Sequence, residues 1–170
     1  DVSRQFTYEQ AENTAVAEIE SFIRNCGPYE FQDLVAALLR GMGYFTPFIA
    51  PKGRDGGVDI LAYSDPLGTV APRIVVQVKH RQQKATVQEI RELSGLLQRD
   101  GDTGLFVSSG GFTTEAEREV KGSRQHIENM DLEKFIGFWK NHYGSLKEED
   151  KALLPLRNIM FLAPTDRATS

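Results

Sequence analysis

Two short runs of branched apolar residues, at positions 58–63 and 74–80, constrain the fold of this chain more than any other feature. Runs of this length between Gly and Pro residues are typical of β-strands. Between them lies the turn signal Ser64-Asp65-Pro66-Leu67-Gly68, and so short a connection joins neighbouring strands that run antiparallel. The sequence therefore predicts an antiparallel pair of strands here.

Both runs carry polar side chains at places where a buried strand would have none. Asp59 follows the stretch Gly53-Arg54-Asp55-Gly56-Gly57, and Gln77 and Lys79 lie two residues apart. Side chains two residues apart leave the same face of a strand. An acid, an amide and an ammonium group are costly to bury unless they serve a ligand or a reaction. We therefore predict that the three converge on a divalent metal ion and a phosphodiester.

Cleavage of a phosphodiester needs charge neutralisation at phosphorus, an oriented water and help for the departing oxygen. Mg²⁺ prefers hard oxygen ligands, keeps several waters and takes one or two carboxylates from protein. The expected ligands are the Asp59 carboxylate, the Gln77 side-chain oxygen and the Val78 backbone carbonyl. Lys79 is expected to hold the attacking water and to stabilise charge on the phosphate. Glu30 is expected to reach the site directly or through water.

The charge distribution adds candidate contacts to phosphate. Residues 52–91 hold more Lys and Arg than Asp and Glu, whereas residues 1–51 are acidic and the whole chain has a net charge of −4. One basic face on an acidic chain is expected where that face meets phosphates. The candidates are Arg54, His80, Arg81 and Lys84. The alternative is purely structural: a solvated basic strand end and loop, with Asp59 in a turn and Gln77 and Lys79 facing solvent.

Helices are predicted before this pair of strands. The first covers residues 7–25, and Gly27-Pro28 begins the second, since Pro is tolerated in the first turn. The second helix has a broad apolar stripe at helical spacing from Phe31 to Met42, which indicates one buried face. A short strand is predicted at residues 45–49.

The later part of the chain alternates between helices and strands. Thr86-Val87-Gln88-Glu89 and Thr114-Glu115-Ala116-Glu117 are capping boxes, each predicted to open a helix. Residues 104–109 are predicted to form a strand, and a strand–helix–strand order implies a parallel pair with a right-handed crossover. The remaining predicted elements are a strand at 126–130, a helix from the cap Asp131 to about residue 142, and a helical turn within 147–154.

Composition excludes several classes of protein. Cys26 is the only cysteine, so a disulfide framework is excluded and a reducing, cytoplasmic location is expected. No apolar run approaches the length of a membrane span and no signal peptide is visible. The stretch Ser108-Ser109-Gly110-Gly111 lacks the Gly-Lys-Ser/Thr of a phosphate-binding loop, which argues against nucleotide hydrolysis.

Four blocks stand in a fixed order along the chain: residues 31–42 followed by Gly43-Tyr44, then Arg54-Asp55-Gly56-Gly57-Val58-Asp59-Ile60, then Val76-Gln77-Val78-Lys79, then Gly104-Leu105-Phe106-Val107 with Gly111-Phe112-Thr113. Together they resemble the catalytic domain of Mrr-type restriction endonucleases, a branch of the PD-(D/E)XK nuclease superfamily. The resemblance covers roughly residues 28–140, most of the chain.

The resemblance implies an α/β fold with a mixed central β-sheet flanked by helices. It implies Mg²⁺-dependent cleavage of double-stranded DNA, with Mn²⁺ as a substitute, and an active site of Asp59, Gln77 and Lys79. Gln77 stands where many members of the superfamily carry an acid, although the Mrr branch often has Gln there. An amide adds no charge and should weaken metal affinity. Restriction of foreign or modified DNA in bacterial defence also comes from the resemblance alone.

Mrr-like proteins usually join this domain to a separate DNA-reading domain. Residues 1–26 are too short for one and are expected to form a lead-in helix or linker, before a nuclease domain at 27–145 and a C-terminal helical extension and tail at 146–170. Target recognition is therefore expected outside this chain or in a partner, and Asp1 in place of Met leaves open that the chain is a piece of a longer protein. A homodimer is a further possibility, because cutting both strands needs two sites.

Two other functions stay open at this point. One is a structure-specific or repair nuclease of the same fold, such as a junction resolvase. The other is a non-catalytic DNA-binding or assembly module, which the acidic net charge and the missing reader domain favour. The complete set of Asp59, Gln77 and Lys79 argues against the second.

Overall fold

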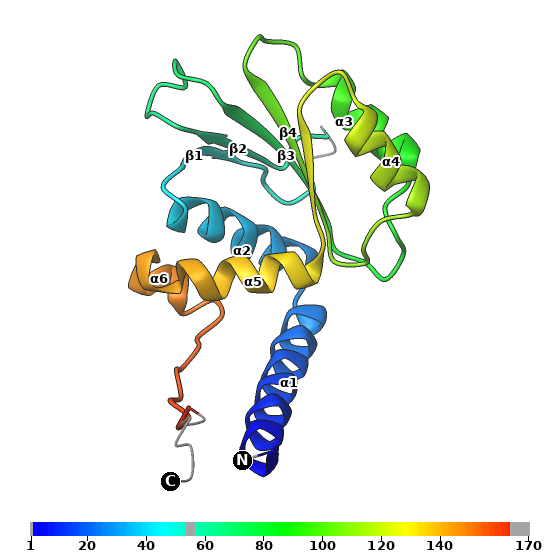
Figure 1. Cartoon of the computed structure of the whole chain (residues 1–170). Helices are drawn as coiled ribbons and strands as arrows, with labels where there is room; N and C mark the ends of the chain where they lie inside the picture. The colour runs from blue at the N-terminus through cyan, green and yellow to red at the C-terminus, as the bar shows by residue number, and fades with distance from the viewer. Residues whose placement is uncertain (1, 54–56, 164–170) are drawn as a thin grey trace, which may run out of the picture.

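A five-stranded mixed sheet in the order β1-β2-β3-β4-β5 forms the centre of the computed structural model, which describes residues 2–53 and 57–163 (Figure 1). The antiparallel half and the parallel half of the sheet share β3. The strands are β1 (Phe45–Ile49), β2 (Ile60–Tyr63), β3 (Arg73–Lys79), β4 (Asp102–Ser108) and β5 (Ile127–Met130). The predicted mixed sheet is confirmed.

The predicted antiparallel pair is β2 and β3, with Ile60 opposite Val76. The prediction that the first strand begins at residue 58 is wrong, because β2 begins at Ile60. Asp59 nevertheless stays bonded to β3, since its N–H donates to the carbonyl of Val76 at 2.9 Å and its carboxylate accepts from the N–H of Val78 at 2.6 Å. These two bonds place Asp59 beside Gln77, the residue between Val76 and Val78.

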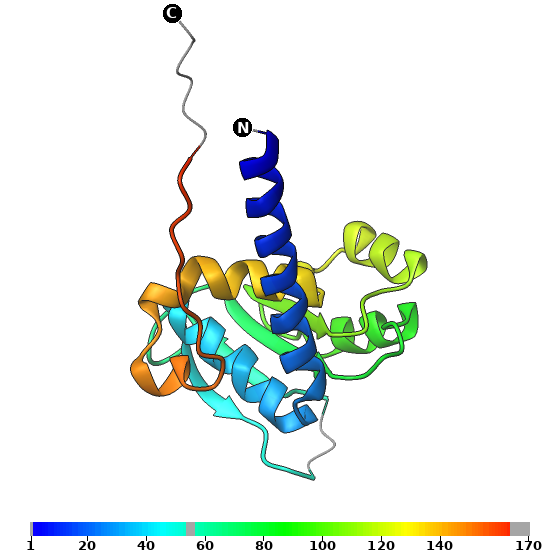
Figure 2. The same ribbon diagram turned by 90° about the horizontal axis from the view of Figure 1, so that it is seen from below.

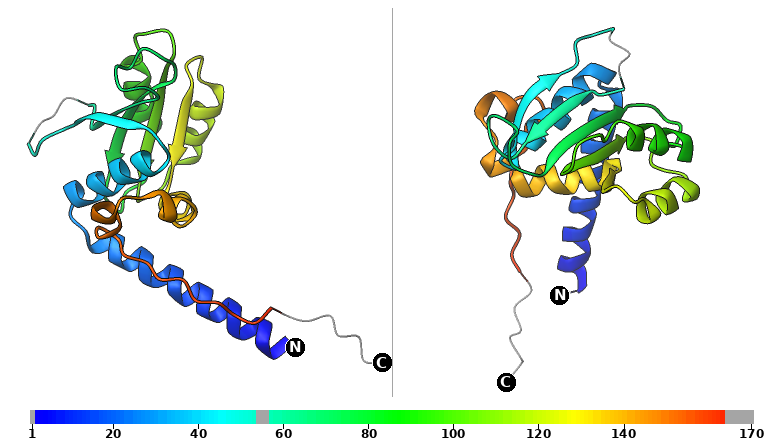
Figure 3. Two further views of the ribbon diagram at one scale, coloured as in Figure 1. Left: turned by 90° about the vertical axis from the view of Figure 1, so that its left-hand side faces the viewer. Right: turned by 90° about the horizontal axis from the view of Figure 1, so that it is seen from above.

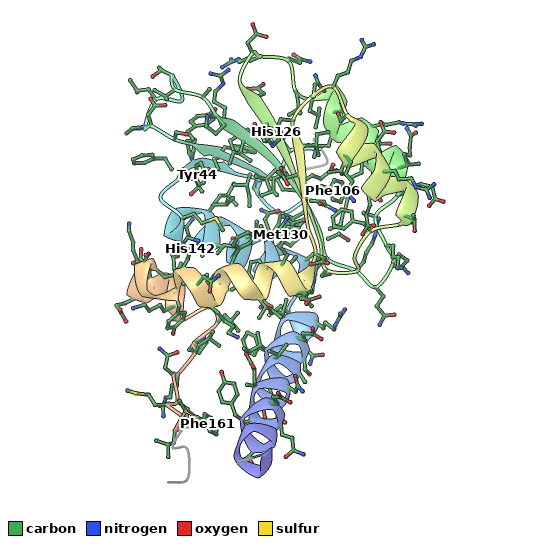
Figure 4. All side chains as sticks on the ribbon, viewed as in Figure 1. Tyr44, Phe106, His126, Met130, His142 and Phe161 are labelled. Atoms are coloured by element: carbon green, nitrogen blue, oxygen red, sulfur yellow. The ribbon has the colours of Figure 1, made fainter. Side chains whose placement is uncertain are left out.

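Helices cover both faces of the sheet (Figures 1 and 2). One face carries α2 (Pro28–Gly41) and α5 (Leu132–His142), and the other carries α3 (Val87–Gly95) and α4 (Thr114–Gly122). Each face has its own apolar cluster, and in Figure 4 Met130 lies on the side of α5 while Phe106 lies on the side of α3 and α4. The sheet is therefore buried on both faces over much of its width.

The two clusters show which way β3 turns its side chains. Ile74 and Val76 belong to the cluster beneath α2 and α5, whereas Val75 belongs to the cluster beneath α3 and α4. Because side chains alternate along a strand, Gln77 and Lys79 continue the Val75 face. They leave the sheet toward the side of α3 and α4.

Side-chain caps set the starts of the later helices. Thr86 and Glu89 form the predicted capping box of α3, and Asp131 accepts from the Lys134 N–H at 2.8 Å as the predicted cap of α5. The predicted capping box at Thr114 is wrong. Thr113 caps α4, because its hydroxyl oxygen accepts from the Ala116 N–H at 3.1 Å, while its own N–H donates to the Ala85 carbonyl at 3.0 Å.

The first and last parts of the chain lie together away from the sheet. α1 (Val2–Asn25) projects from the body, and the extended residues 155–163 follow it (Figures 2 and 3). The rings of Tyr8 and Phe161 meet edge-on, with centroids 5.2 Å apart. The predicted turn within 147–154 is α6 (Glu148–Lys151), which follows a short 3₁₀ helix, Tyr143–Ser145.

The C-terminal extension contributes to the core. Leu146 and Leu154 are buried in the same cluster as α2 and α5, and Arg40 of α2 makes a bidentate ion pair with Asp150 at 2.7 and 3.2 Å. The proposed domain boundaries remain a prediction. No helix among residues 2–53 and 57–163 combines the length and apolar character that a membrane span requires.

Candidate active site

Asp59 is held in place by both its main chain and its side chain. Its carbonyl accepts from the Ala50 N–H at 2.8 Å, and its N–H donates to Val76. Its Oδ2 accepts a hydrogen bond from the Val78 N–H at 2.6 Å. Among the described residues, the other carboxylate oxygen, Oδ1, has no hydrogen-bond donor. Asp59 therefore presents one fixed oxygen to a ligand.

Gln77 lies between the two residues of β3 that bond to Asp59, Val76 and Val78, and is only 6% exposed. Its side-chain oxygen, Oε1, is buried and has no hydrogen-bond partner within the described part of the chain. Leaving a buried carbonyl oxygen unsatisfied costs about 1–3 kcal/mol. An oxygen that is kept buried and unpaired beside a carboxylate is suited to bind a cation.

Lys79 is two residues further along the same face of β3. Its ammonium group forms no hydrogen bond or ion pair with any residue that the structure describes. Burial raises the pKa of the Asp59 carboxyl above its usual value, and the Val78 N–H and the Lys79 charge oppose this rise. The charge of Lys79 therefore favours the ionised form of Asp59.

Glu89 of α3 also interacts with the charge of Lys79, although the sequence pattern predicted only a capping role for it. Burial alone would raise the pKa of Glu89, but hydrogen bonds from Arg81 and Thr86, and the charges of Arg81 and Lys79, bring it below its usual value. Both carboxylate oxygens lie 2.7 Å from Nη2 of Arg81. The only sequence signal for Glu89 was its capping position, three residues after Thr86.

His80 points away from the other candidate residues. Its Nε2 lies 2.9 Å from the Cys26 carbonyl, so this nitrogen must carry a proton, and its Nδ1 lies 2.9 Å from Ser109 Oγ. Its ring packs on Phe31 with centroids 4.7 Å apart. His80 therefore joins β3 to α1 and α2 on the face opposite Lys79, and the structure does not bring it to the site.

The other predicted residues are placed as follows. Glu30 Oε2 accepts from the Gly27 N–H at 2.8 Å at the start of α2, and no hydrogen bond or ion pair with described residues joins it to the site. Arg81 is engaged by Glu89, while Lys84 is exposed. Arg54 lies outside the described residues.

Gln32 supports Asp59 and was not predicted. It is 6% exposed, and its Nε2 donates to the Ala50 carbonyl at 2.9 Å. Ala50 in turn donates to Asp59. The apolar stripe around Gln32 predicted a buried helix face, but nothing in the sequence pairs Gln32 with Ala50. This connection ties α2 to the position of Asp59.

The available donors fit a hard divalent cation. No group of three or more His, Cys, Asp or Glu in the described ranges could hold a metal, so the set is one carboxylate, the Gln77 amide oxygen and a backbone carbonyl. The backbone carbonyl is that of Val78. Carbonyls two residues apart point to the same edge of a strand, and the Val76 carbonyl accepts from the Asp59 N–H, so the Val78 carbonyl also points to the Asp59 side of β3. Mg²⁺ binds through few protein oxygens and keeps several waters.

Comparisons with known proteins agree with this architecture. Residues 23–139 match a family model described as restriction endonuclease. An uncharacterized protein of Sinorhizobium fredii, y4cE, is 26% identical over 65% of this chain and 29% of its own length.

Two solved structures share the fold. The restriction endonuclease MspJI, solved with a 27-mer oligonucleotide, is 18% identical, with a TM-score of 0.57 over 85% of this chain and 35% of its own. AspBHI, a DNA modification-dependent restriction endonuclease, is 16% identical, with a TM-score of 0.60 over 81% of this chain and 38% of its own. The chain thus spans less than two fifths of the length of each of these relatives.

Proposed function

The chain belongs to the Mrr catalytic-domain family of restriction endonucleases, and from this we propose that it hydrolyses phosphodiester bonds of double-stranded DNA with Mg²⁺ as its cofactor. One observation carries the proposal beyond the family. The bonds of Asp59 to Val76 and Val78 place its carboxylate beside Gln77, each of the two side chains has an oxygen without a hydrogen-bond partner among the described residues, and Lys79 continues the face of Gln77. These are the groups that phosphodiester hydrolysis requires.

In the proposed mechanism, Asp59 Oδ1, Gln77 Oε1 and the Val78 carbonyl would hold the cation. A bound divalent cation supplies positive charge to the phosphate and makes a bound water more acidic. The Val78 N–H keeps the Asp59 carboxylate turned toward its ligand. Lys79 donates hydrogen bonds to the attacking water and to a phosphate oxygen, where negative charge develops in the transition state.

We propose that Lys84 and Arg54 contact the DNA backbone. Both belong to the basic segment 52–91, in which Arg54 precedes the two site strands and Lys84 follows them. Lys84 is exposed and has no ion-pair partner among the described residues. Arg81 and His80 are engaged inside the protein, so we assign them structural roles in place of the phosphate contacts considered from sequence.

We propose that target selection comes from a DNA-reading part outside this chain, because the relatives are much longer than the segment they share with it. The modification-dependent relative AspBHI makes modified DNA the first substrate to test. Each chain carries one candidate site, so cutting both strands favours a homodimer. A DNA substrate and a lone Cys26 fit action in the cytoplasm.

Cleavage of supercoiled plasmid tests the proposal. Wild type is assayed with Mg²⁺ or Mn²⁺ on methylated and unmethylated DNA, beside Lys79→Ala and a control, Lys140→Ala, which removes the same charge from α5. We expect metal-dependent nicking or linearisation by wild type and Lys140→Ala, and a loss of about 10²–10³-fold in Lys79→Ala. Equal cutting by Lys79→Ala would refute the assigned role.

A further inference from the structure

Two buried polar atoms in the described part of the chain have no hydrogen-bond partner, and both lie at the candidate site. One is Gln77 Oε1 and the other is the hydroxyl oxygen of Ser108, a residue that is 0% exposed. Buried polar groups in folded proteins are nearly always satisfied. Two exceptions side by side therefore indicate a shared role.

The sheet register places these two atoms on neighbouring strands. In the parallel pairing of β3 with β4, Gln77 is opposite Phe106 and Lys79 is opposite Ser108. Ser108 is thus the diagonal neighbour of Gln77. Phe106 belongs to the cluster beneath α3 and α4, and Ser108, two residues further on, leaves β4 on that same face. Gln77 accordingly has Asp59 on one side and Ser108 on the other.

The chemistry of the two groups is complementary through a water molecule. They make no direct hydrogen bond, and diagonal neighbours in a sheet are separated by about 7–8 Å between Cα atoms, which leaves room for one water between their side-chain ends. The hydroxyl of Ser108 donates one proton, whereas Gln77 Oε1 only accepts. A water that accepts from Ser108 can donate to Oε1.

We propose that Ser108 is a positioning residue of the active site, which holds the Gln77 side-chain oxygen toward the cation through one buried water. The inference rests on the proposed function. A side-chain amide is nearly symmetric in shape, and rotation by half a turn would present its NH₂ group to a cation. A water that already accepts from Ser108 has protons to donate, so it pairs with Oε1 and not with the NH₂ group. Because Oε1 has two lone pairs, it can accept from this water and bind the cation at the same time.

The test uses three substitutions in the full chain. Ser108→Ala and the nearly isosteric Ser108→Cys remove the hydroxyl, and Ser108→Thr keeps it. Mn²⁺ affinity is measured by electron paramagnetic resonance titration without DNA, and the metal-free Tm is measured in parallel. The control is Ser94→Ala, which removes a hydroxyl bonded to Gln125 Oε1 at 2.6 Å on α3.

We expect Ser108→Ala and Ser108→Cys to weaken Mn²⁺ binding about 10-fold, as loss of a partner that orients a metal ligand does. Ser108→Thr and Ser94→Ala should bind Mn²⁺ as wild type does. In cleavage assays the KM for metal should rise more than kcat falls.

Two outcomes would overturn the inference and are distinguishable. If Ser108→Ala and Ser108→Cys bind Mn²⁺ as tightly as wild type, and the Tm of Ser108→Ala rises, Ser108 is only an unsatisfied hydroxyl and the proposed function stands. If wild type binds Mn²⁺ no better than Asp59→Asn, the metal site itself is wrong, and the proposed function fails together with the inference.

Discussion

Asp59 accepts a hydrogen bond of 2.6 Å from the backbone N–H of Val78, the residue between the two candidate side chains of β3. This bond joins the residue directly before β2 to β3, the strand that carries Gln77 and Lys79. It fixes one carboxylate oxygen to the sheet and leaves the other for a ligand. The same arrangement buries a negative charge, which has a cost for folding.

We expect Asp59→Asn to raise the metal-free Tm at pH 7 by a few degrees. Burial raises the folded pKa of Asp59 above its unfolded value. Ionisation of Asp59 therefore opposes folding most at pH above the folded pKa. The penalty disappears as pH falls below the unfolded pKa, and the advantage of Asn, which mimics the protonated acid, should disappear with it. Thermal unfolding between pH 3 and pH 8 measures this. A lower Tm for the variant at every pH would contradict it.

Gln77→Glu should have the opposite effects to Asp59→Asn: lower stability without metal and tighter metal binding. Two carboxylates opposite each other on neighbouring strands repel, so the metal-free Tm should fall. Added negative charge should strengthen Mn²⁺ binding, so saturating Mn²⁺ should raise the Tm more than in wild type. Differential scanning fluorimetry with and without Mn²⁺ checks both expectations.

Gln77→Leu is the matched variant for that comparison. It removes the unsatisfied oxygen, which costs about 1–3 kcal/mol when buried, so its metal-free Tm should be at least that of wild type. Its response to Mn²⁺ should be lost. Equal Mn²⁺ responses in the Leu and Glu variants would show that Gln77 is not a ligand.

The parts of the site that could be predicted from sequence are those set by local rules. Asp59 lies beside β3 because a short turn joins β2 to β3 as antiparallel neighbours, and strand alternation places Lys79 on the face of Gln77. The same alternation implies that the His80 side chain leaves the face of β3 opposite Lys79, as the structure shows. Applied to His80, this rule argues against the phosphate contact that its sequence position suggested.

The supporting contacts could not be predicted in the same way. Gln32 reaches Ala50, and Ser108 lies beside Lys79, because α2 and β4 pack next to β3 in three dimensions. No spacing rule connects residues so far apart in sequence. The sequence pattern alone indicates Thr114 as the cap of α4, whereas the structure has Thr113 as the cap, which also bonds to the distant Ala85.

Arg81→Ala should destabilise the protein by about 1 kcal/mol at pH 7, because it breaks an ion pair at the start of α3 in which one guanidinium nitrogen, Nη2, contacts both carboxylate oxygens of Glu89. The folded pKa of Glu89 lies below its usual value, so this stabilisation is present above the unfolded pKa and is lost as pH falls through the folded one. Urea unfolding at pH 7 and at pH 3 measures the change.

Arg91→Ala is the control for that prediction. Arg91 makes one contact of 3.0 Å with Glu119, and its side chain is 60% exposed. Exposed pairs of this kind contribute little, so the change should stay within about 0.5 kcal/mol. Equal losses of unfolding free energy in the two variants would mean that the ion pair of Arg81 contributes no more stability than the exposed pair of Arg91.

Gly110→Ala should loosen the loop that follows β4, whereas Gly137→Ala should stabilise α5. A methyl group on Gly110 would come within 2.7 Å of the carbonyl oxygens of residues 81–83, so the segment after Lys79 would have to move. Nothing lies within 4 Å of a methyl group on Gly137, and Ala in a helix interior gains about 0.5–1 kcal/mol over Gly. We expect a lower Tm and slower DNA cleavage for Gly110→Ala, and a higher Tm with unchanged cleavage for Gly137→Ala. Unchanged stability and cleavage in Gly110→Ala would show that the loop adapts without disturbing Lys79.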